Sequence, residues 1–292
     1  MLIDTHSHIY EPEFDADREQ AIERCHEAGV ELIMLPAIDS ESYERMFAFA
    51  RRYPDFALPM MGLHPTSVNE NPRWRADLEL VERYLQQPPE GISRFWGVGE
   101  IGLDLYWSSD YREQQIEAFK AQVEMSIKYN LPIVVHTRNA WEEMCQVMEE
   151  FAGRGVRGIF HAFSDGVESY ERIKKCGDFL FGIGGVVTFK KSKLVPVVEQ
   201  MDLSDIVIET DCPYLTPAPH RGERNESSYV KYICPKIAEI KGIDYQSVEA
   251  QTTANAKRIF NYKYPYEYIN GFSEMLKRKS AIEEFYSSFK LD

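Results

Sequence analysis

The sequence predicts an α/β protein with a (β/α)8, TIM-barrel-like fold, and three observations lead to this prediction. Eight short apolar runs recur along the chain, and segments with helical periodicity separate them. Most of these runs are continuously apolar, as expected for parallel strands that helices cover. The length of 292 residues, 44% of them hydrophobic, is enough for one barrel domain with a sizeable core.

Each apolar run is interpreted as one barrel strand. The predicted strands, in chain order, are Met1–Asp4, Leu32–Leu35, Ala57–Met61, Gly97–Gly99, Ile133–His136, Gly158–Phe160, Phe179–Ile183 and Ile206–Glu209. The segment between the fourth and fifth strands illustrates the predicted helices. Asp110 and Glu113 resemble a capping box at a helix start. An apolar stripe at helical spacing follows, formed by Ile116, Phe119, Val123 and Ile127.

The domain organisation is predicted to be simple. No stretch has the composition of a linker, a repeat or a low-complexity segment. Residues 1–261 are therefore expected to form one barrel domain. Beyond them the sequence becomes tyrosine-rich and then charged and amphipathic. Residues 262–292 are therefore interpreted as a C-terminal helical extension of the same domain, either packed on the barrel or in contact with a partner.

Charge and cysteine content restrict the class of protein. The formal net charge of −14 argues against a long basic track along nucleic acid, although it allows a small site at a strand end. We see no signal-peptide pattern, and no apolar run approaches the roughly 20 residues of a membrane span. The five cysteines are widely spaced and include no Cys-x-x-Cys pair, which fits reduced thiols in a cytoplasmic protein. The expected state is a monomer or weak oligomer without a membrane partner.

Six polar residues end or follow the predicted strands, and their types suit a metal site. They are His6, His8, Glu100, His136, His161 and Asp211. The carboxyl ends of barrel strands share one rim, where (β/α)8 enzymes place their active sites, so these side chains are expected to converge. Imidazole and carboxylate groups are the usual ligands of divalent transition-metal ions. The sequence therefore predicts a metal centre on this rim.

Each of these residues also has a plainer interpretation. His6 and His8 can be two ordinary histidines, although residues two apart on a strand share a face and can reach one ion. His136 or His161, taken singly, can be a hydrogen-bonded core histidine. Glu100 can lie in a solvated turn, but an unpaired carboxylate at a buried strand end is costly, and a carboxylate can bridge two ions. The same placement at several strands favours the metal site.

Asp211 ends a run that also contains Glu209, and two acids there can form a solvated rim. Alternatively, Asp211 is a ligand that also accepts a proton from water, because divalent ions lower the pKa of a bound water. Two divalent ions beside the Glu100 and Asp211 carboxylates would give a local charge of about +2. A phosphodiester would be attracted to such a site within an acidic protein.

These motifs together resemble the TatD family of metal-dependent hydrolases, in the amidohydrolase-like barrel superfamily. The matching stretches are 4–8, 62–65, 99–104, 136–138, 161–164, 209–217, 221–226 and 253–256. They cover residues 1–261 in the right order, which is far more specific than any single motif. Tyr10, Asp165 and Glu223 depart from the pattern, in which Asp, Gly and Lys are more usual at these positions.

The resemblance implies a pair of divalent ions, which can be Zn, Mg, Mn, Co or Fe. One ion is held by His6, His8 and Asp211 and the other by His136 and His161, with Glu100 bridging. Glu100 and Asp211 are then the catalytic carboxylates. The implied reaction is phosphodiester hydrolysis, typically DNase activity, in which a hydroxide held between the ions attacks. DNA or another phosphodiester is the expected partner, and the negative charge favours exonuclease action at strand ends.

Four residues on loops after predicted strands are candidates for substrate binding, namely His64, Arg138, Arg221 and Asn225. An arginine fork suits phosphate oxygens, although each charged residue can instead be solvated or held in a salt bridge. Asn225 can contact a sugar or a base edge, or it can fix its loop. Tyr106 and Trp107 can stack on a base or serve packing.

Two other functions stay open at this point. The same metal–water chemistry can hydrolyse esters or amides, and some TatD relatives are associated with the removal of D-amino acids from tRNA. A non-catalytic metal-binding scaffold that acts through its C-terminal tail is a third interpretation. The intact ligand set argues against this scaffold.

Overall fold

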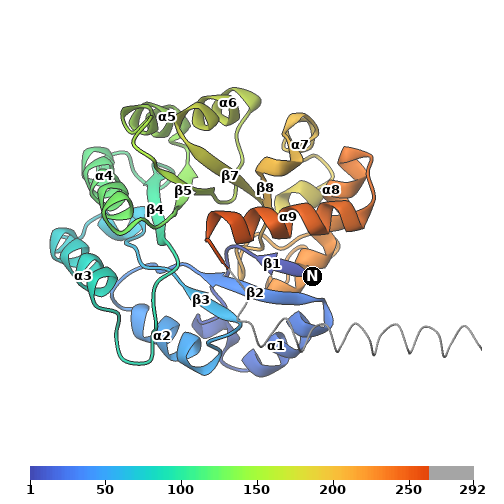
Figure 1. The fold of residues 1–292 in the computed structure, drawn as a ribbon, viewed down its shortest axis with the longest axis horizontal. Helices are drawn as coiled ribbons and strands as arrows, with labels where there is room; N and C mark the ends of the chain where they lie inside the picture. The colour runs from blue at the N-terminus through green and yellow to red at the C-terminus, as the bar shows by residue number, and fades with distance from the viewer. Residues whose placement is uncertain (263–292) are drawn as a thin grey trace, which may run out of the picture. The chain divides into compact units, whose positions relative to one another are not determined.

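A barrel of parallel strands, surrounded by helices, forms the fold of residues 1–262, which are the residues that the computed structural model describes (Figure 1). The strands are β1 (Leu2–Asp4), β2 (Val30–Leu35), β3 (Ala57–Pro59), β4 (Val98–Asp104), β5 (Ile133–Arg138), β6 (Arg157–Phe160), β7 (Asp178–Ile183) and β8 (Ile206–Ile208). Together they confirm the predicted (β/α)8 class. The predicted extension at 262–292 lies, beyond its first residue, outside the described part of the chain.

Two seams complete the barrel. The strands form the parallel sheets β1-β2-β3 and β4-β5-β6-β7-β8. Isolated parallel bridges join the sheets, one between Met61 and Val98 and the other between Ser7 and Cys212. At the second seam the His8 amide donates to the Cys212 carbonyl at 2.9 Å. This bond brings the segment after β1 beside the segment after β8.

Helices occupy the segments between the strands, as the periodicity predicts, and two more helices follow β8. The helices are α1 (Arg18–Glu27), α2 (Tyr43–Arg52), α3 (Trp74–Gln86), α4 (Arg112–Tyr129), α5 (Trp141–Glu150), α6 (Val167–Cys176), α7 (Val195–Gln200), α8 (Val230–Lys241) and α9 (Tyr245–Ile259). Short 3-10 helices add η1 (Pro12–Phe14), η2 (Pro65–Val68), η3 (Gly185–Thr188), η4 (Leu203–Asp205) and η5 (Ser227–Tyr229). No helix within residues 1–262 is long and apolar enough to cross a membrane.

Helix α4 buries its apolar stripe as predicted, but it does not begin with the predicted capping box. Phe119 and Val123 are fully buried, so the stripe faces the core as predicted. The helix begins at Arg112, however, and its N-cap has no side-chain hydrogen bond. Glu113 is bonded to the guanidinium of Arg112 instead of reaching back to the cap, so the predicted capping box is absent.

Strands β4 and β5 run further than their apolar runs predict. The pairing continues through Gly102 with His136 and ends with Asp104 opposite Arg138. Glu100 therefore lies within its strand rather than just past it, and His136 lies inside its strand rather than at the end. Gly102 is required here, because a Cβ at this position would lie 1.9 Å from the carbonyl oxygen of His136.

The two ends of the barrel differ. Helix α9 lies against the amino ends of β1 and β8, where the Asn255 amide donates to the carbonyls of Leu203 and Ile206 at 2.9 and 2.8 Å. Thr253 donates from the same helix to the carbonyl of Met1. The opposite end, where the strands finish, carries the predicted ligands and a pocket.

Candidate metal centre

All six predicted ligands lie together at the carboxyl end of the barrel. His6 and His8 follow β1, Glu100 lies in β4, His136 lies in β5, His161 follows β6 and Asp211 follows β8. His6, His8, Glu100 and His161 are at most 3% exposed. Five strands and the segments that directly follow them thus deliver imidazole and carboxylate groups into one buried cluster.

Glu100 is at the centre of this cluster, and its two oxygens face different neighbours. Oε1 lies 2.8 Å from Nε2 of His161 and 2.9 Å from Nδ1 of His136. Oε2 lies 3.2 Å from Nε2 of His6 and 3.5 Å from Nε2 of His8. One carboxylate therefore separates the histidines into a β1 side (His6 and His8) and a β5–β6 side (His136 and His161).

Asp211 completes the β1 side. Its Oδ1 lies 3.7 Å from Nε2 of His6 and 3.6 Å from Nε2 of His8. The residue adopts a φ of 57°, in the left-handed region that Asp tolerates better than most residues. This conformation turns the chain directly after β8, and the carboxylate lies beside the histidines that follow β1.

The far ring nitrogens decide which nitrogen of each histidine can bind an ion. On the β1 side, the hydroxyl of Tyr10 donates to the carbonyl of Pro36 at 2.6 Å, so it accepts from Nδ1 of His8 at 3.1 Å. On the β5–β6 side, Oδ2 of Asp104 accepts from Nε2 of His136 at 3.0 Å. These bonds leave Nε2 of His8 and Nδ1 of His136, which face Glu100, as the nitrogens that can bind an ion.

The remaining two histidines differ in the same way. Oε1 of Glu209 lies 3.6 Å from Nδ1 of His161 and accepts from the amide of Ala162. Gly182 leaves the space for this carboxylate, since a Cβ there would lie 2.0 Å from Oε2 of Glu209. Nδ1 of His6 and Nδ1 of His161 are both buried and have no hydrogen-bond partner among the described residues, but only His161 has a carboxylate near that nitrogen. The β5–β6 side is therefore backed by carboxylates, whereas the β1 side is backed by a phenol alone.

Tyr10, Asp104 and Glu209 are the functional residues that the sequence analysis did not assign. Asp104 could have been predicted from the sequence, because it is four residues past Glu100 in one strand and residues at even spacing share a face. Glu209 was noted only as a neighbouring acid. Tyr10 was noted only as a departure from the family pattern.

Burial and mutual charge shift the pKa values in this cluster in opposite directions. Burial raises the pKa of Glu100, but the surrounding histidines outweigh it and hold that pKa well below its usual value. Burial likewise raises the pKa of Asp211, and the hydrogen bond from His8 turns the net shift downward. Both carboxylates are therefore ionised at neutral pH.

The histidines respond to these carboxylates. Burial lowers the pKa of His8, but its contacts with Asp211 and Glu100 reverse the effect and raise that pKa to about 9. The pKa values of His136 and His161 are also raised against burial, by Asp104 and Glu100 and by Glu100 and Glu209 respectively. The pKa of His6 is lowered, because burial and the nearby His161 both disfavour its charge.

This chemistry fits divalent ions. Three groups of ligand atoms lie within 4.8 Å of one another: those of His6, His8 and Glu100, those of His6, His161 and Asp211, and those of His64, Glu100 and His136. Nε2 of His6 and Nε2 of His8 face each other at 3.2 Å, an arrangement that an ion between them satisfies. A positive ion also replaces the protons that the raised pKa values require.

A pocket of about 620 Å³ opens over this cluster. His64, Trp107 and Arg138 line it together with Tyr214, Leu215 and Val186. Two predicted substrate-binding residues, His64 and Arg138, thus face the site. Arg138 stacks on Tyr106, with its guanidinium carbon 3.6 Å from the ring centroid, and has no carboxylate within 4.0 Å among the described residues.

The other two predicted substrate-binding residues lie elsewhere. Asn225 is fully buried, and its amide donates to the carbonyls of Thr210 and Tyr214. The structure therefore favours the loop-fixing alternative for Asn225. Arg221 stacks on Phe189, with 3.6 Å between the guanidinium carbon and the ring centroid, beyond the residues that line the pocket.

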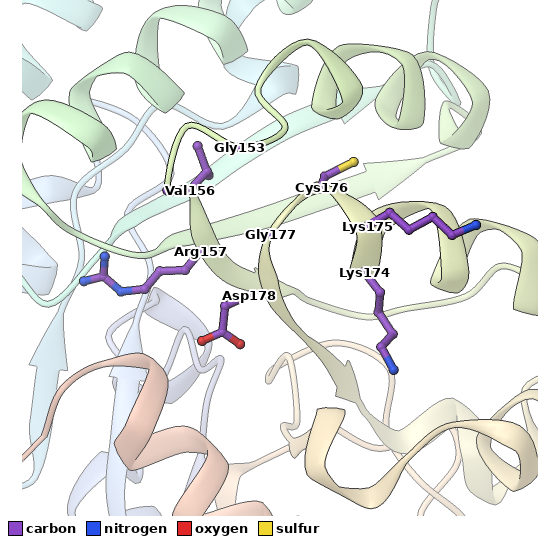
Figure 2. Close-up of a pocket in the computed structure, with 9 residues that line it drawn as sticks. Gly153, Val156, Arg157, Lys174, Lys175, Cys176, Gly177 and Asp178 are labelled. Atoms are coloured by element: carbon purple, nitrogen blue, oxygen red, sulfur yellow. The ribbon is translucent and has the colours of Figure 1, made fainter.

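A second pocket, shown in Figure 2, lies at the opposite end of the barrel, where β6 and β7 begin. Two of its cations have partners: Lys174 pairs with Asp205 at 2.7 Å, and Arg157 donates to the side chain of Asn130 at 2.9 Å. Lys175 is exposed beside them. This pocket gathers none of the clustered ligands, so the chemistry belongs to the end where the strands finish.

The fold and the ligand cluster together define a metal-dependent hydrolase with an amidohydrolase-like barrel. Residues 3–261 match the family model described as TatD related DNase, and the chain belongs to this TatD family.

Relatives of known name agree with this assignment. An uncharacterized metal-dependent hydrolase, YabD of Bacillus subtilis, is 36% identical over 89% of this chain and 99% of its own length. A 3'-5' ssDNA/RNA exonuclease, TatD of Erwinia tasmaniensis, is 27% identical over 89% of this chain and 100% of its own. The crystal structure of YjjV, a TatD homologue from Escherichia coli, superposes with a TM-score of 0.81 at 26% identity, covering 90% of this chain and 98% of YjjV.

Proposed function

We propose that this protein is a metal-dependent phosphodiester hydrolase, a deoxyribonuclease that trims strand ends with two divalent ions. The observation that carries the proposal is the orientation of the Glu100 carboxylate. Its Oε1 faces the β5–β6 side and its Oε2 faces the β1 side. A carboxylate with a separate ligand group at each oxygen is suited to hold two ions close together. The naming of a 27% identical relative as an ssDNA/RNA exonuclease supports nucleic acid as the substrate.

His6, His8 and Asp211 would hold one ion, His136 and His161 the other, and Glu100 would bridge them. Divalent ions in these positions supply Lewis acidity toward the phosphoryl group and lower the pKa of the attacking water. Asp211 is ionised and partly exposed to the pocket, so its carboxylate is placed to accept the proton of that water.

His64 lies close enough to Glu100 and His136 to join a metal group, and we infer instead that it donates a hydrogen bond to the substrate. Its Nδ1 accepts from the backbone amide of Thr66 at 3.2 Å, so the proton of the neutral ring is on Nε2. Nε2 faces Oε1 of Glu100 at 3.4 Å and is directed into the site. Burial lowers the pKa of His64, which keeps the ring neutral. We assign this N–H to a phosphate oxygen of the substrate.

Arg138 is the second group for the phosphate. Stacking on Tyr106 fixes the plane of its guanidinium and leaves the N–H edges free. The exposed rings of Trp107 and Tyr214 at the pocket mouth suit unpaired bases better than a stacked duplex. This arrangement favours a single strand with a free end over internal cleavage of a duplex.

The test is digestion of a single-stranded DNA oligonucleotide, labelled at its 5' end, with added Mn²⁺ or Mg²⁺. We expect stepwise shortening that a chelator abolishes and that Asp211→Asn reduces by about 10² to 10⁴. Asp178→Asn is the matched control, because Asp178 is half-exposed and ion-paired with Arg258 at the opposite end of the barrel. Faster nicking of duplex circles than trimming of ends would contradict the strand-end assignment. Hydrolysis of an aminoacyl ester without cleavage of the oligonucleotide would replace the nuclease with an ester hydrolase.

A further inference from the structure

Four exposed cations lie on the loops after β7 and β8, outside the residues that line the metal pocket. We call the surface made by Lys190, Lys191, Lys193 and Arg221 the basic rim. All four residues are exposed, and none has a carboxylate within 4.0 Å among residues 1–262. The formal net charge of the chain is −14, so a cluster of cations without acidic partners is an unusual local feature.

The basic rim is continuous with the wall of the pocket. Val186, in η3, and Leu215 both line the pocket. The hydroxyl of Thr188 accepts from the amide of Ala218 at 2.8 Å, which ties the loop after β7 to the loop after β8. Phe189 lies three residues past Val186, and the guanidinium of Arg221 stacks on its ring, with 3.6 Å between the guanidinium carbon and the ring centroid. One surface therefore runs from the metal pocket to the rim.

Different groups occupy the other side of the pocket. Trp107 and Tyr106, on the loop after β4, are 70% and 50% exposed, and Tyr106 carries Arg138. In a barrel of eight strands in sequential order, the loop after β4 lies across the mouth from the loops after β7 and β8. The loop after β4 thus brings stacking groups to one side of the pocket, and the cations of the basic rim lie on the loops of the other side, together with the exposed ring of Tyr214.

We propose that the basic rim binds the backbone phosphates of a single-stranded nucleic acid, beyond the nucleotide whose phosphodiester bond lies at the metal centre. The proposal rests on the proposed nuclease function. Lysine and arginine without acidic partners suit phosphates in a chain, and the continuity of the surface suits a strand that already enters the pocket. Elsewhere the acidic protein repels such a strand, which limits the contact to a short footprint.

The test compares a 12-nucleotide single-stranded DNA with bis(p-nitrophenyl) phosphate, a diester too small to reach the rim. The Mn²⁺-loaded enzyme and its Lys190→Gln/Lys191→Gln/Lys193→Gln variant are assayed on both substrates over a range of salt concentrations. Each phosphate contact on a single strand contributes about 0.7 to the salt slope of log affinity, so loss of three contacts lowers the slope of log kcat/KM by about 2. At low salt we expect the ratio of kcat/KM for the 12-mer to that for the small diester to fall about tenfold or more.

The matched control removes the same charge at the other end of the barrel. Arg83, Arg94 and Lys175 are exposed and have no carboxylate within 4.0 Å among the described residues; they precede β4 or, like Lys175 in Figure 2, lie near the start of β7. The Arg83→Gln/Arg94→Gln/Lys175→Gln variant has the same net charge as the rim variant, and we expect its ratio and its salt slope to stay near those of the wild type.

Several results would overturn the proposal. Equal losses in the two triple variants would show that net charge, and not the rim, attracts the strand. Weakened binding of the rim variant to vesicles of anionic lipid, with an unchanged ratio for the 12-mer, would assign the rim to a membrane surface. Cleavage of the small diester by wild type without cleavage of the 12-mer would reject the rim as a strand site while leaving the hydrolase in place. Cleavage of neither substrate would reject the proposed function itself.

Discussion

The β1 side and the β5–β6 side of the metal centre share Glu100 but are supported differently. His136 and His161 lie 2.9 and 2.8 Å from Glu100 and have the Asp104 and Glu209 carboxylates at their far nitrogens. His6 and His8 lie 3.2 and 3.5 Å from Glu100, and only His8 has a far partner, the phenol of Tyr10. Since a carboxylate behind a histidine makes the ring a stronger metal ligand, the two sides should differ in metal affinity and in their sensitivity to mutation.

The largest effect is expected from replacing Glu100, the residue that the two sides share. Glu100→Gln takes away the charge that both oxygens offer, so we expect fewer than two ions per chain and a loss of phosphodiesterase activity of about 10³-fold or more. Metal content after dialysis and turnover of bis(p-nitrophenyl) phosphate measure the two results. Glu117→Gln, an exposed glutamate paired with Arg75, is the control. Two ions retained at full activity would show that Glu100 does not bridge.

The next largest effect is a difference in metal affinity between the two sides, which substitutions behind His136 and His8 should reveal. Asp104→Asn should weaken metal binding on the β5–β6 side by about 10- to 100-fold, because the variant loses the carboxylate behind His136. Tyr10→Phe should weaken binding on the β1 side by only about 3- to 10-fold, since a neutral hydrogen bond is roughly half as strong as a charged one. Calorimetric titration with Mn²⁺ gives both affinities. Equal losses would mean that the charge of the far partner is irrelevant.

A smaller effect concerns the space around Glu209. Gly182→Ala places a Cβ 2.0 Å from Oε2 of Glu209, so we expect the free energy of unfolding to fall by about 1–3 kcal/mol. Metal affinity on the β5–β6 side should fall with it. Gly184→Ala is the matched control, because its Cβ would meet Glu209 at an ordinary 3.6 Å. Denaturant unfolding of the metal-free protein measures the difference, and equal stabilities would contradict this packing.

The smallest expected effect concerns the number of protons that the site releases when metal binds. The pKa of about 9 for His8 means that this ring is protonated at pH 7 before metal binds, and the pKa values of His136 and His161 are shifted in the same direction. A protonated ring has no lone pair for an ion, so binding at pH 7 must release about one proton or more. Affinity should rise with pH and level off above about 9. Titration in buffers of different ionisation enthalpy counts the protons, and no net release would contradict the shifts.

Much of this arrangement follows from the order of residues along the chain. Barrel topology brings the ends of parallel strands to one rim, so the positions of His6, His161 and Asp211 after apolar runs were enough to predict that they meet. The lengths of β4 and β5 were not predictable from apolar runs, because their pairing continues through polar residues up to Asp104 and Arg138.

The partners behind the histidines were harder to predict, for a physical reason. Tyr10 and Glu209 act through contacts that depend on three-dimensional packing, such as the space that Gly182 leaves. Asn225 shows the converse case, in which a polar residue of a conspicuous motif is bonded to its own loop. Strand order predicts which side chains meet, but the direction of a buried amide or phenol is set by neighbours that sequence spacing does not encode.

The most direct test is the position of the ions themselves. Crystals of the protein loaded with Mn²⁺ would be measured for anomalous scattering. We predict two peaks, one beside Oε2 of Glu100 among His6, His8 and Asp211, and one beside Oε1 among His136 and His161. A single peak, or a pair in which neither ion contacts Glu100, would contradict the dinuclear centre on which the proposed hydrolase depends.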